Sequence, residues 1–141
     1  MTKGRALIDT GPIVATLREK DEHHVACKEE LSRRKPPLYT CWPVVTEAAW
    51  LLRDDAVALE GLFRAFQGGL LALLPIDESA MPWLDDFLRR YRSIRAQLAD
   101  AALVYLAERE GIRTIFTLDR RDFSVYRYGR NRSVKIIPAL Q

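Results

Sequence analysis

The sequence predicts an α/β sandwich with a mostly parallel central sheet, and two observations lead to this prediction. Short apolar runs, typical of buried strands, alternate along the chain with longer segments of helical periodicity. This alternation is typical of a parallel sheet that helices cover on its faces. The expected strands lie at 5–8, 38–41, 70–76, 114–118 and 134–137.

Turn and capping residues delimit the helices between these strands. Pro12 suits the first turn of a helix after the first strand, and Asp21 is expected to cap a helix over 22–34. Gly111 suits the C-cap of the last long helix. Since the chain has no internal repeat and no Gly/Ser linker, we expect a single domain over 1–141. Further helices are expected over 43–53, 57–67, 80–92 and 98–110.

The composition excludes several classes of protein. With 48% apolar and 29% charged residues, the 141-residue chain is globular rather than disordered. The net charge of +3 permits contact with phosphates without requiring it. Cys27 and Cys41 are too few for a disulfide framework, which favours a reducing compartment. Because no signal-peptide pattern and no apolar run of membrane-spanning length is found, we expect a cytoplasmic protein with no membrane segment.

Acids follow three of the expected strands. Asp9 ends the first strand and Asp119 follows the strand at 114–118. Ligand sites in open parallel sheets lie beyond the carboxyl ends of the strands, which makes both acids site candidates. Each could equally be a turn residue that accepts hydrogen bonds from its own backbone. Asp77 also follows a strand, but Glu78 beside it and the helix that opens near Ser79 favour a turn and a helix cap.

Two more acids interrupt the apolar faces of expected helices. Residues spaced i, i+3, i+4, i+7 form one apolar face on each of the helices over 43–53 and 98–110. Glu47 interrupts the first face and Asp100 the second. Glu47 could reach water at the margin of its face. Asp100 lies near the start of its helix, where the helix dipole alone could stabilise its negative charge. Burying an unpaired carboxylate is costly and neither face holds a basic residue, so a divalent cation shared by all four acids is the simpler explanation.

The four acids lie in four segments of the chain, which are 6–15 (ALIDTGPIVA), 44–52 (VVTEAAWLL), 99–104 (ADAALV) and 114–123 (TIFTLDRRDF). In this order the segments resemble the motifs of the PIN domain family. The resemblance covers nearly the whole chain and implies a PIN-like three-layer α/β/α sandwich with a mostly parallel central sheet. The length is most similar to the toxin branch of type II toxin–antitoxin systems, the VapC-like ribonucleases.

The resemblance implies an endoribonuclease that hydrolyses RNA phosphodiesters with Mg²⁺ or Mn²⁺. Ligands with oxygen donors only, without His or Cys, suit these hard cations. By motif position, the catalytic and metal-binding acids would be Asp9, Glu47, Asp100 and Asp119. The supporting residues would be Thr10, Thr117 and an accessory acid, Asp122. Glu47 would bind the metal directly or through water, or act as a base, and the sequence leaves these roles open.

Arginines flank the third and fourth motifs and suit contacts with RNA phosphates. Tyr126 and Tyr128 stand among them and could stack on bases. The alternative is a solvated, arginine-rich loop. The candidate RNA-binding residues are Arg95, Arg120, Arg121, Arg127 and Arg130.

The resemblance also implies partners, which are the RNA substrate, a second copy of the chain and a small antitoxin protein. The apolar helix surface over 56–66 could serve either protein contact. Three other functions are considered. The first two are a PIN-type nuclease of RNA processing that has no antitoxin and a non-catalytic PIN-like interaction module. The third, an aspartyl-phosphate phosphotransferase, generally has a second acid two residues after the first, where this chain has Gly11.

Overall fold

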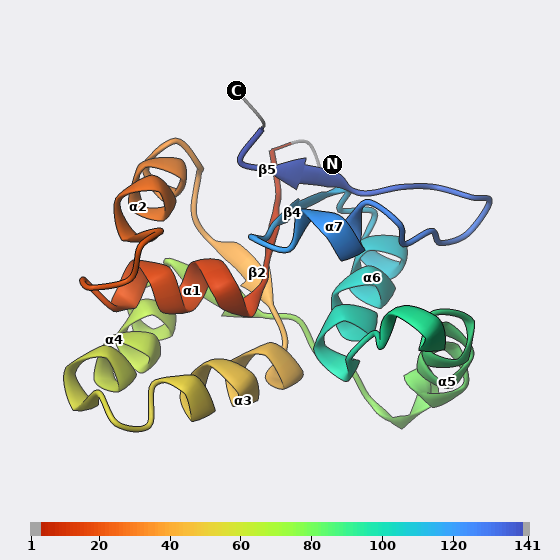
Figure 1. Cartoon of the computed structure of the whole chain (residues 1–141), viewed down its shortest axis with the longest axis horizontal. Helices are drawn as coiled ribbons and strands as arrows, with labels where there is room; N and C mark the ends of the chain where they lie inside the picture. Colours follow the sequence, from red (N-terminus) through yellow and green to blue (C-terminus); the bar gives the residue numbers. More distant parts are fainter. Residues whose placement is uncertain (1–3, 140–141) are drawn as a thin grey trace.

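The computed structural model describes residues 4–139, which form an α/β fold around a five-stranded sheet (Figure 1). The strand order is β3-β2-β1-β4-β5, and each neighbouring pair of strands is parallel. The predicted α/β fold with a mostly parallel sheet is therefore confirmed. The strands are β1 (Leu7–Ile8), β2 (Leu38–Thr40), β3 (Leu71–Leu73), β4 (Thr114–Phe116) and β5 (Lys135–Ile137).

Helices cover both faces of the sheet, with α1, α2 and α4 on one side and α5 and α6 on the other (Figure 1). Among the helices of residues 4–139, none is long and apolar enough to cross a membrane. The helices are α1 (Thr10–Leu17), α2 (His24–Ser32), α3 (Trp42–Leu51), α4 (Ala56–Gln67), α5 (Met81–Arg90), α6 (Leu98–Glu110) and α7 (Arg120–Phe123). Two 3₁₀ turns, η1 (Glu78–Ala80) and η2 (Arg92–Ile94), flank α5.

Side chains at the helix ends explain where several helices begin and stop. Gly111 ends α6 at a φ of 67°, as its predicted role as C-cap requires. The prediction that Asp21 caps a helix is wrong, because its carboxylate accepts the N–H of His23 in the turn before α2. Helix α7 is not predicted from the sequence, since four residues are too few to show helical periodicity.

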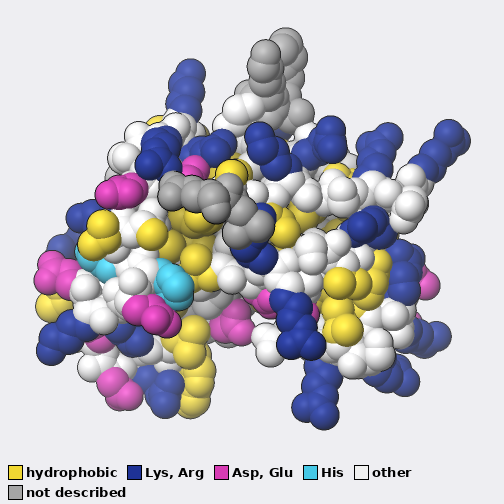
Figure 2. Space-filling view, turned by 45° about the horizontal axis from the view of Figure 1, so that its top comes forward, with side chains coloured by type: hydrophobic (Ala, Val, Ile, Leu, Met, Phe, Trp, Pro, Cys, Tyr) yellow, Lys and Arg dark blue, Asp and Glu magenta, His cyan; other side chains and the backbone are white. Residues whose placement is uncertain are grey.

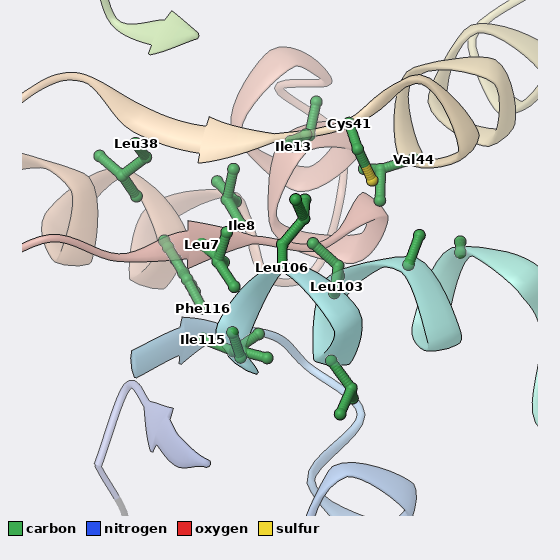
Figure 3. Packing of buried hydrophobic residues seen from close by; sticks show 14 of the residues in the cluster. Leu7, Ile8, Ile13, Leu38, Cys41, Val44, Leu103, Leu106, Ile115 and Phe116 are labelled. Atoms are coloured by element: carbon green, nitrogen blue, oxygen red, sulfur yellow. The ribbon is translucent and has the colours of Figure 1, made fainter. Parts of the chain in front are cut away.

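The hydrophobic core lies around β1 and β4, the two strands after which Asp9 and Asp119 stand. Leu7 of β1 and Ile115 of β4 are fully buried. Leu106 of α6 and Ile13 of α1 belong to the same cluster and reach it from different helices (Figure 3). This packing fixes the positions of the carboxyl ends of β1 and β4.

The strand order reverses between β1 and β4. From β1 the chain proceeds to β2 and β3 on one side, and later to β4 and β5 on the other. Ligands of open parallel sheets bind outside the carboxyl ends of the strands at such a reversal. At this reversal Leu7 and Ile8 of β1 pair with Ile115 and Phe116 of β4. Asp9 directly follows β1 and Thr117 directly follows β4, so the two residues lie side by side at this edge.

Candidate active site

A pocket of about 500 Å³ lies at this edge of the sheet and collects acids from four elements. Asp9 is the N-cap of α1, Glu47 lies on α3, Asp100 on α6 and Asp119 at the N-cap of α7. The structure thus brings all four predicted acids together in one pocket. The residues that line it are Asp9, Thr10, Gly11, Glu47, Leu51, Arg95, Gln97, Asp100, Leu118, Asp119 and Asp122.

Asp9 is the most deeply buried acid of the pocket, with 8% of its surface exposed. Its Oδ1 accepts the backbone N–H of Thr10 at 2.8 Å, and its Oδ2 accepts the hydroxyl of Thr117 at 2.8 Å. Burial raises the pKa of Asp9 from its ordinary value of 3.8 to about 7, although these two hydrogen bonds oppose the change. The negative charges of Asp100 and Glu47 raise it further. Asp9 is therefore harder to ionise than an exposed aspartate, and a positive charge in the pocket would favour its ionised form.

Thr117 connects Asp9 to the turn after β4. Its buried hydroxyl donates to Asp9 and accepts the backbone N–H of Asp119 at 3.0 Å. Asp119 Oδ1 in turn accepts the N–H of Asp122 at 3.1 Å, which caps the short helix α7. Asp119 therefore accepts a hydrogen bond from nearby backbone, as the turn-residue alternative predicts, and it also lines the pocket.

Three of the carboxylates form a tight group. Asp100, Asp119 and Asp122 each offer an oxygen, and these oxygens lie within 4.8 Å of one another. Among the described residues, Asp9 and Glu47 line the pocket outside this group. Asp122, expected to be only an accessory acid, therefore belongs to the closest cluster of the site.

Crowding and burial change the acidity of this group. Burial raises the pKa of Asp100 from 3.8 to about 6, and the charges of Asp119 and Asp122 add to the increase. Hydrogen bonds from Tyr126 and from the backbone N–H of Gln97 act in the opposite direction. The pKa of Asp122 is also raised, first by burial and then by the charge of Asp119.

The pocket fits a hard divalent cation by the chemistry of its donors. Within residues 4–139, none of the five pocket carboxylates forms a salt bridge, so no Lys, Arg or His side chain pairs directly with them. Thr10 adds a buried hydroxyl oxygen that has no hydrogen-bond partner in this part of the chain. Carboxylate and hydroxyl oxygens are typical ligands of Mg²⁺ and Mn²⁺ or of their bound waters.

The predicted RNA-binding arginines differ in what their side chains do. Arg95 lines the pocket and is exposed, and Arg121 and Arg130 are also exposed. The guanidinium of Arg120 instead donates to the carbonyl of Pro138 at 2.6 Å, and that of Arg127 donates to three nearby carbonyls. Figure 2 shows many Lys and Arg side chains toward the top and right of the face that it draws.

The prediction that Tyr126 and Tyr128 stack on bases is wrong. Tyr126 is fully buried and Tyr128 is 3% exposed, so neither ring face is available to RNA. Tyr126 packs instead against Phe87 of α5 and Phe123 of α7. Tyrosines between arginines resemble a stacking platform in sequence, but here they belong to the core.

Two contacts to Asp100 are not predicted from the sequence. Tyr126 donates its hydroxyl to Asp100 Oδ2 at 2.7 Å. Gln97, the N-cap of α6, lines the pocket and lies three residues before Asp100, the spacing of a capping box. The capping spacing is visible in the sequence, whereas nothing in the sequence pairs residue 126 with residue 100.

Known proteins are similar to this chain, in sequence or in fold, over most of its length. The family model described as PIN domain matches residues 6–128. Ribonuclease VapC26 of Mycobacterium tuberculosis is 32% identical over 123 residues, which cover 86% of this chain and 91% of that protein. The crystal structure of Mycobacterium tuberculosis VapC20, a sarcin-ricin loop cleaving toxin, has a TM-score of 0.74 at 16% identity. It covers 82% of this chain and 91% of its own, which shows a common fold.

Proposed function

This chain belongs to the PIN domain family, and we propose that it is a toxin-type endoribonuclease that hydrolyses RNA phosphodiesters with Mg²⁺ or Mn²⁺. The observation that supports this most strongly is the meeting of acids from four separate segments in one pocket. A non-catalytic PIN-like module would have no need to keep five unpaired carboxylates together. An aspartyl-phosphate enzyme would use Asp9 as a nucleophile and would generally have a second acid two residues later, where this chain has Gly11.

In this proposal each pocket residue has a defined part. Asp100, Asp119 and Asp122 would hold the cation, with Asp9 completing the site from the end of β1. With the cation bound, the site supplies an activated water and positive charge for the phosphate oxygens. Thr117 keeps Asp9 and the backbone of Asp119 in register. Two more residues complete the proposed site. Thr10 has a buried hydroxyl without a hydrogen-bond partner in this part of the chain, and Glu47 would bind the cation directly or through water or accept a proton.

The direct test is cleavage of total RNA by the purified chain with and without divalent cations. We expect EDTA to stop the cleavage and added Mn²⁺ or Mg²⁺ to restore it, because the acids alone cannot balance the charge that builds up on the phosphate. Product ends mapped by sequencing would identify the cleaved bond. Cleavage that continues unchanged in EDTA would contradict the proposal.

We propose that Arg95, Arg121 and Arg130 contact the RNA backbone, with Arg95 nearest the acids. Arg95→Ala is expected to weaken RNA binding and to reduce the slope of log affinity against log salt by about one. Fluorescence anisotropy at several salt concentrations measures both quantities. Arg89→Ala is the matched control, because Arg89 lies on α5 and pairs with Asp85 at 3.0 Å. Equal slopes for the two variants would contradict the role of Arg95.

We also propose that the protein acts in the cytoplasm as one 141-residue domain, forms a homodimer and is inhibited by an antitoxin. Apolar side chains exposed on its helices favour protein contacts, including Val57 (78% exposed) and Phe63 (49%) of the predicted surface over 56–66. Trp50 (63%) lies on the neighbouring helix α3. A sedimentation mass equal to the 16.2 kDa of one chain would rule out the homodimer. An RNA-processing enzyme without an antitoxin would have no neighbouring gene whose product blocks cleavage.

A further inference from the structure

Tyr126 lies outside the four motifs, yet its side chain reaches Asp100, one of the acids that line the pocket. It stands in the segment between α7 and β5, and its hydroxyl donates to Asp100 Oδ2 at 2.7 Å. A hydrogen bond to a carboxylate is stronger than one between neutral groups. The contact joins two residues that are 26 positions apart and belong to different elements.

Aromatic rings hold the ring of Tyr126 in place on several sides. Its centroid lies 5.0 Å from that of Phe87 and 5.0 Å from that of Tyr91, both in edge-on contact. Phe123 of α7 makes a third edge-on contact at 5.2 Å. Because the Tyr126 side chain is fully buried in this cluster, the hydroxyl has little freedom to leave Asp100.

The backbone around Tyr126 is held as firmly as its ring. The guanidinium of Arg127 donates to the carbonyls of Ser124, Val125 and Tyr126 at 2.8, 3.2 and 2.9 Å. The backbone N–H of Arg127 donates to the hydroxyl of Tyr91 at 2.8 Å. These bonds attach the turn that contains Tyr126 to the end of α5. The Tyr126 hydroxyl is therefore held in a fixed position beside Asp100.

Asp100 needs such a contact because of its neighbours. Its carboxylate lies within 4.8 Å of oxygens of Asp119 and Asp122, and like charges at this distance repel one another. Among the hydrogen bonds of the described residues, the one made to this carboxylate comes from Tyr126, and the backbone of Gln97 on its own helix also favours its charged form. A side chain held at its base alone could turn away from the other two acids.

We infer that Tyr126 is a positioning residue, whose hydroxyl holds the Asp100 carboxylate in the orientation in which it joins Asp119 and Asp122. The inference rests on the proposed function insofar as these acids hold a cation. Hydrogen-bond partners of ligating carboxylates orient the ligand and typically change metal affinity 10- to 100-fold when removed. Tyr126 itself contacts neither cation nor substrate in this assignment.

The test compares Tyr126→Phe with the unaltered protein. Phe keeps the ring and its three aromatic contacts but removes the donor. We expect Mn²⁺ to bind about tenfold more weakly in isothermal titration calorimetry. We also expect kcat to fall while the KM for RNA changes little, because the RNA-contacting surface is untouched. In the double variant with Asp100→Asn, the loss of Mn²⁺ affinity should not exceed that of Asp100→Asn alone.

Tyr128→Phe is the matched control. Tyr128 is buried in the same segment, and in the described structure it forms no hydrogen bond to a site acid. The Tyr128→Phe variant should bind Mn²⁺ with the same affinity as the unaltered protein. Equal affinity for Tyr126→Phe and the unaltered protein, or an equal loss in both tyrosine variants, would overturn the inference.

A measurement without metal separates this inference from the proposed function. In crystals of the metal-free protein, Tyr126→Phe should show the Asp100 carboxylate turned away from Asp119 and Asp122. If the unaltered protein binds no Mn²⁺, the proposed function fails, but this comparison still tests the contact. An Asp100 side chain that keeps its place without the hydroxyl would show that Tyr126 does not position it.

Discussion

Replacing Asp9 with Asn is expected to abolish metal-stimulated RNA cleavage while making the metal-free protein more stable. Asp9 supplies a buried negative charge at the end of β1, and Asn has the same shape without that charge. Losing one charged ligand should lower the cleavage rate by about 10³-fold, the equivalent of roughly 4 kcal/mol in transition-state stabilisation. Cleavage of labelled RNA in saturating Mn²⁺ measures the loss.

The gain in stability follows from the same burial. The pKa of Asp9 is about 7 in the folded protein and 3.8 in its ordinary state. Ionised Asp9 therefore costs about 4 kcal/mol of folding free energy at pH 8. Asn avoids most of this cost but loses the hydroxyl donor of Thr117, so the net gain is smaller. Thermal unfolding in EDTA should show a midpoint several degrees above that of the unaltered protein.

Asp77→Asn is the matched control for Asp9→Asn. Asp77 also follows a strand, but it is exposed and its Oδ1 accepts the N–H and hydroxyl of Ser79 in a local turn. It does not line the acidic pocket. Cleavage by Asp77→Asn should equal that of the unaltered protein. Substantial cleavage by Asp9→Asn would remove Asp9 from the proposed site.

The sequence predicts the sheet and the four main acids for a physical reason. Asp9 and Asp119 follow apolar strands, and Glu47 and Asp100 interrupt apolar helix faces, so local patterns alone make them unusual. All four line one pocket. Their catalytic roles remain predictions.

Features that depend on packing between distant segments are not visible in the same way. Asp122 joins the closest carboxylates because a four-residue helix, α7, turns it toward Asp100. Tyr126 looks like a base-stacking residue between arginines, whereas its burial against α5 makes it a hydrogen-bond donor to Asp100. Side-chain direction in such short irregular segments is set by tertiary contacts, which residue patterns do not encode.

Lowering the pH from 8 to 5 is expected to stabilise the metal-free protein and to weaken metal binding. Burial raises the pKa of Asp9 to about 7 and that of Asp100 to about 6, both above their ordinary value of 3.8. Between pH 4 and 7 the folded state therefore binds more protons at these acids than the unfolded state does. Their contribution to stability falls as the pH rises through this window and is constant above it.

Metal binding has the opposite pH dependence, because a cation needs the ionised carboxylates that protons neutralise. Proton competition at Asp9 alone should weaken Mn²⁺ affinity about 100-fold between pH 8 and pH 5. Mn²⁺ should accordingly raise the unfolding midpoint much more at pH 8 than at pH 5. Calorimetric titrations and thermal unfolding at the two pH values measure both effects.

Comparison with Asp9→Asn separates the contribution of Asp9 from that of other titrating groups. Every other acid and both histidines remain in that variant, so the difference between the two pH profiles belongs to Asp9 and its immediate couplings. We expect the metal-free stability of Asp9→Asn to change less between pH 5 and pH 8 than that of the unaltered protein. Identical profiles would mean that Asp9 has the same pKa in the folded and the unfolded protein, which would contradict a pKa raised by burial.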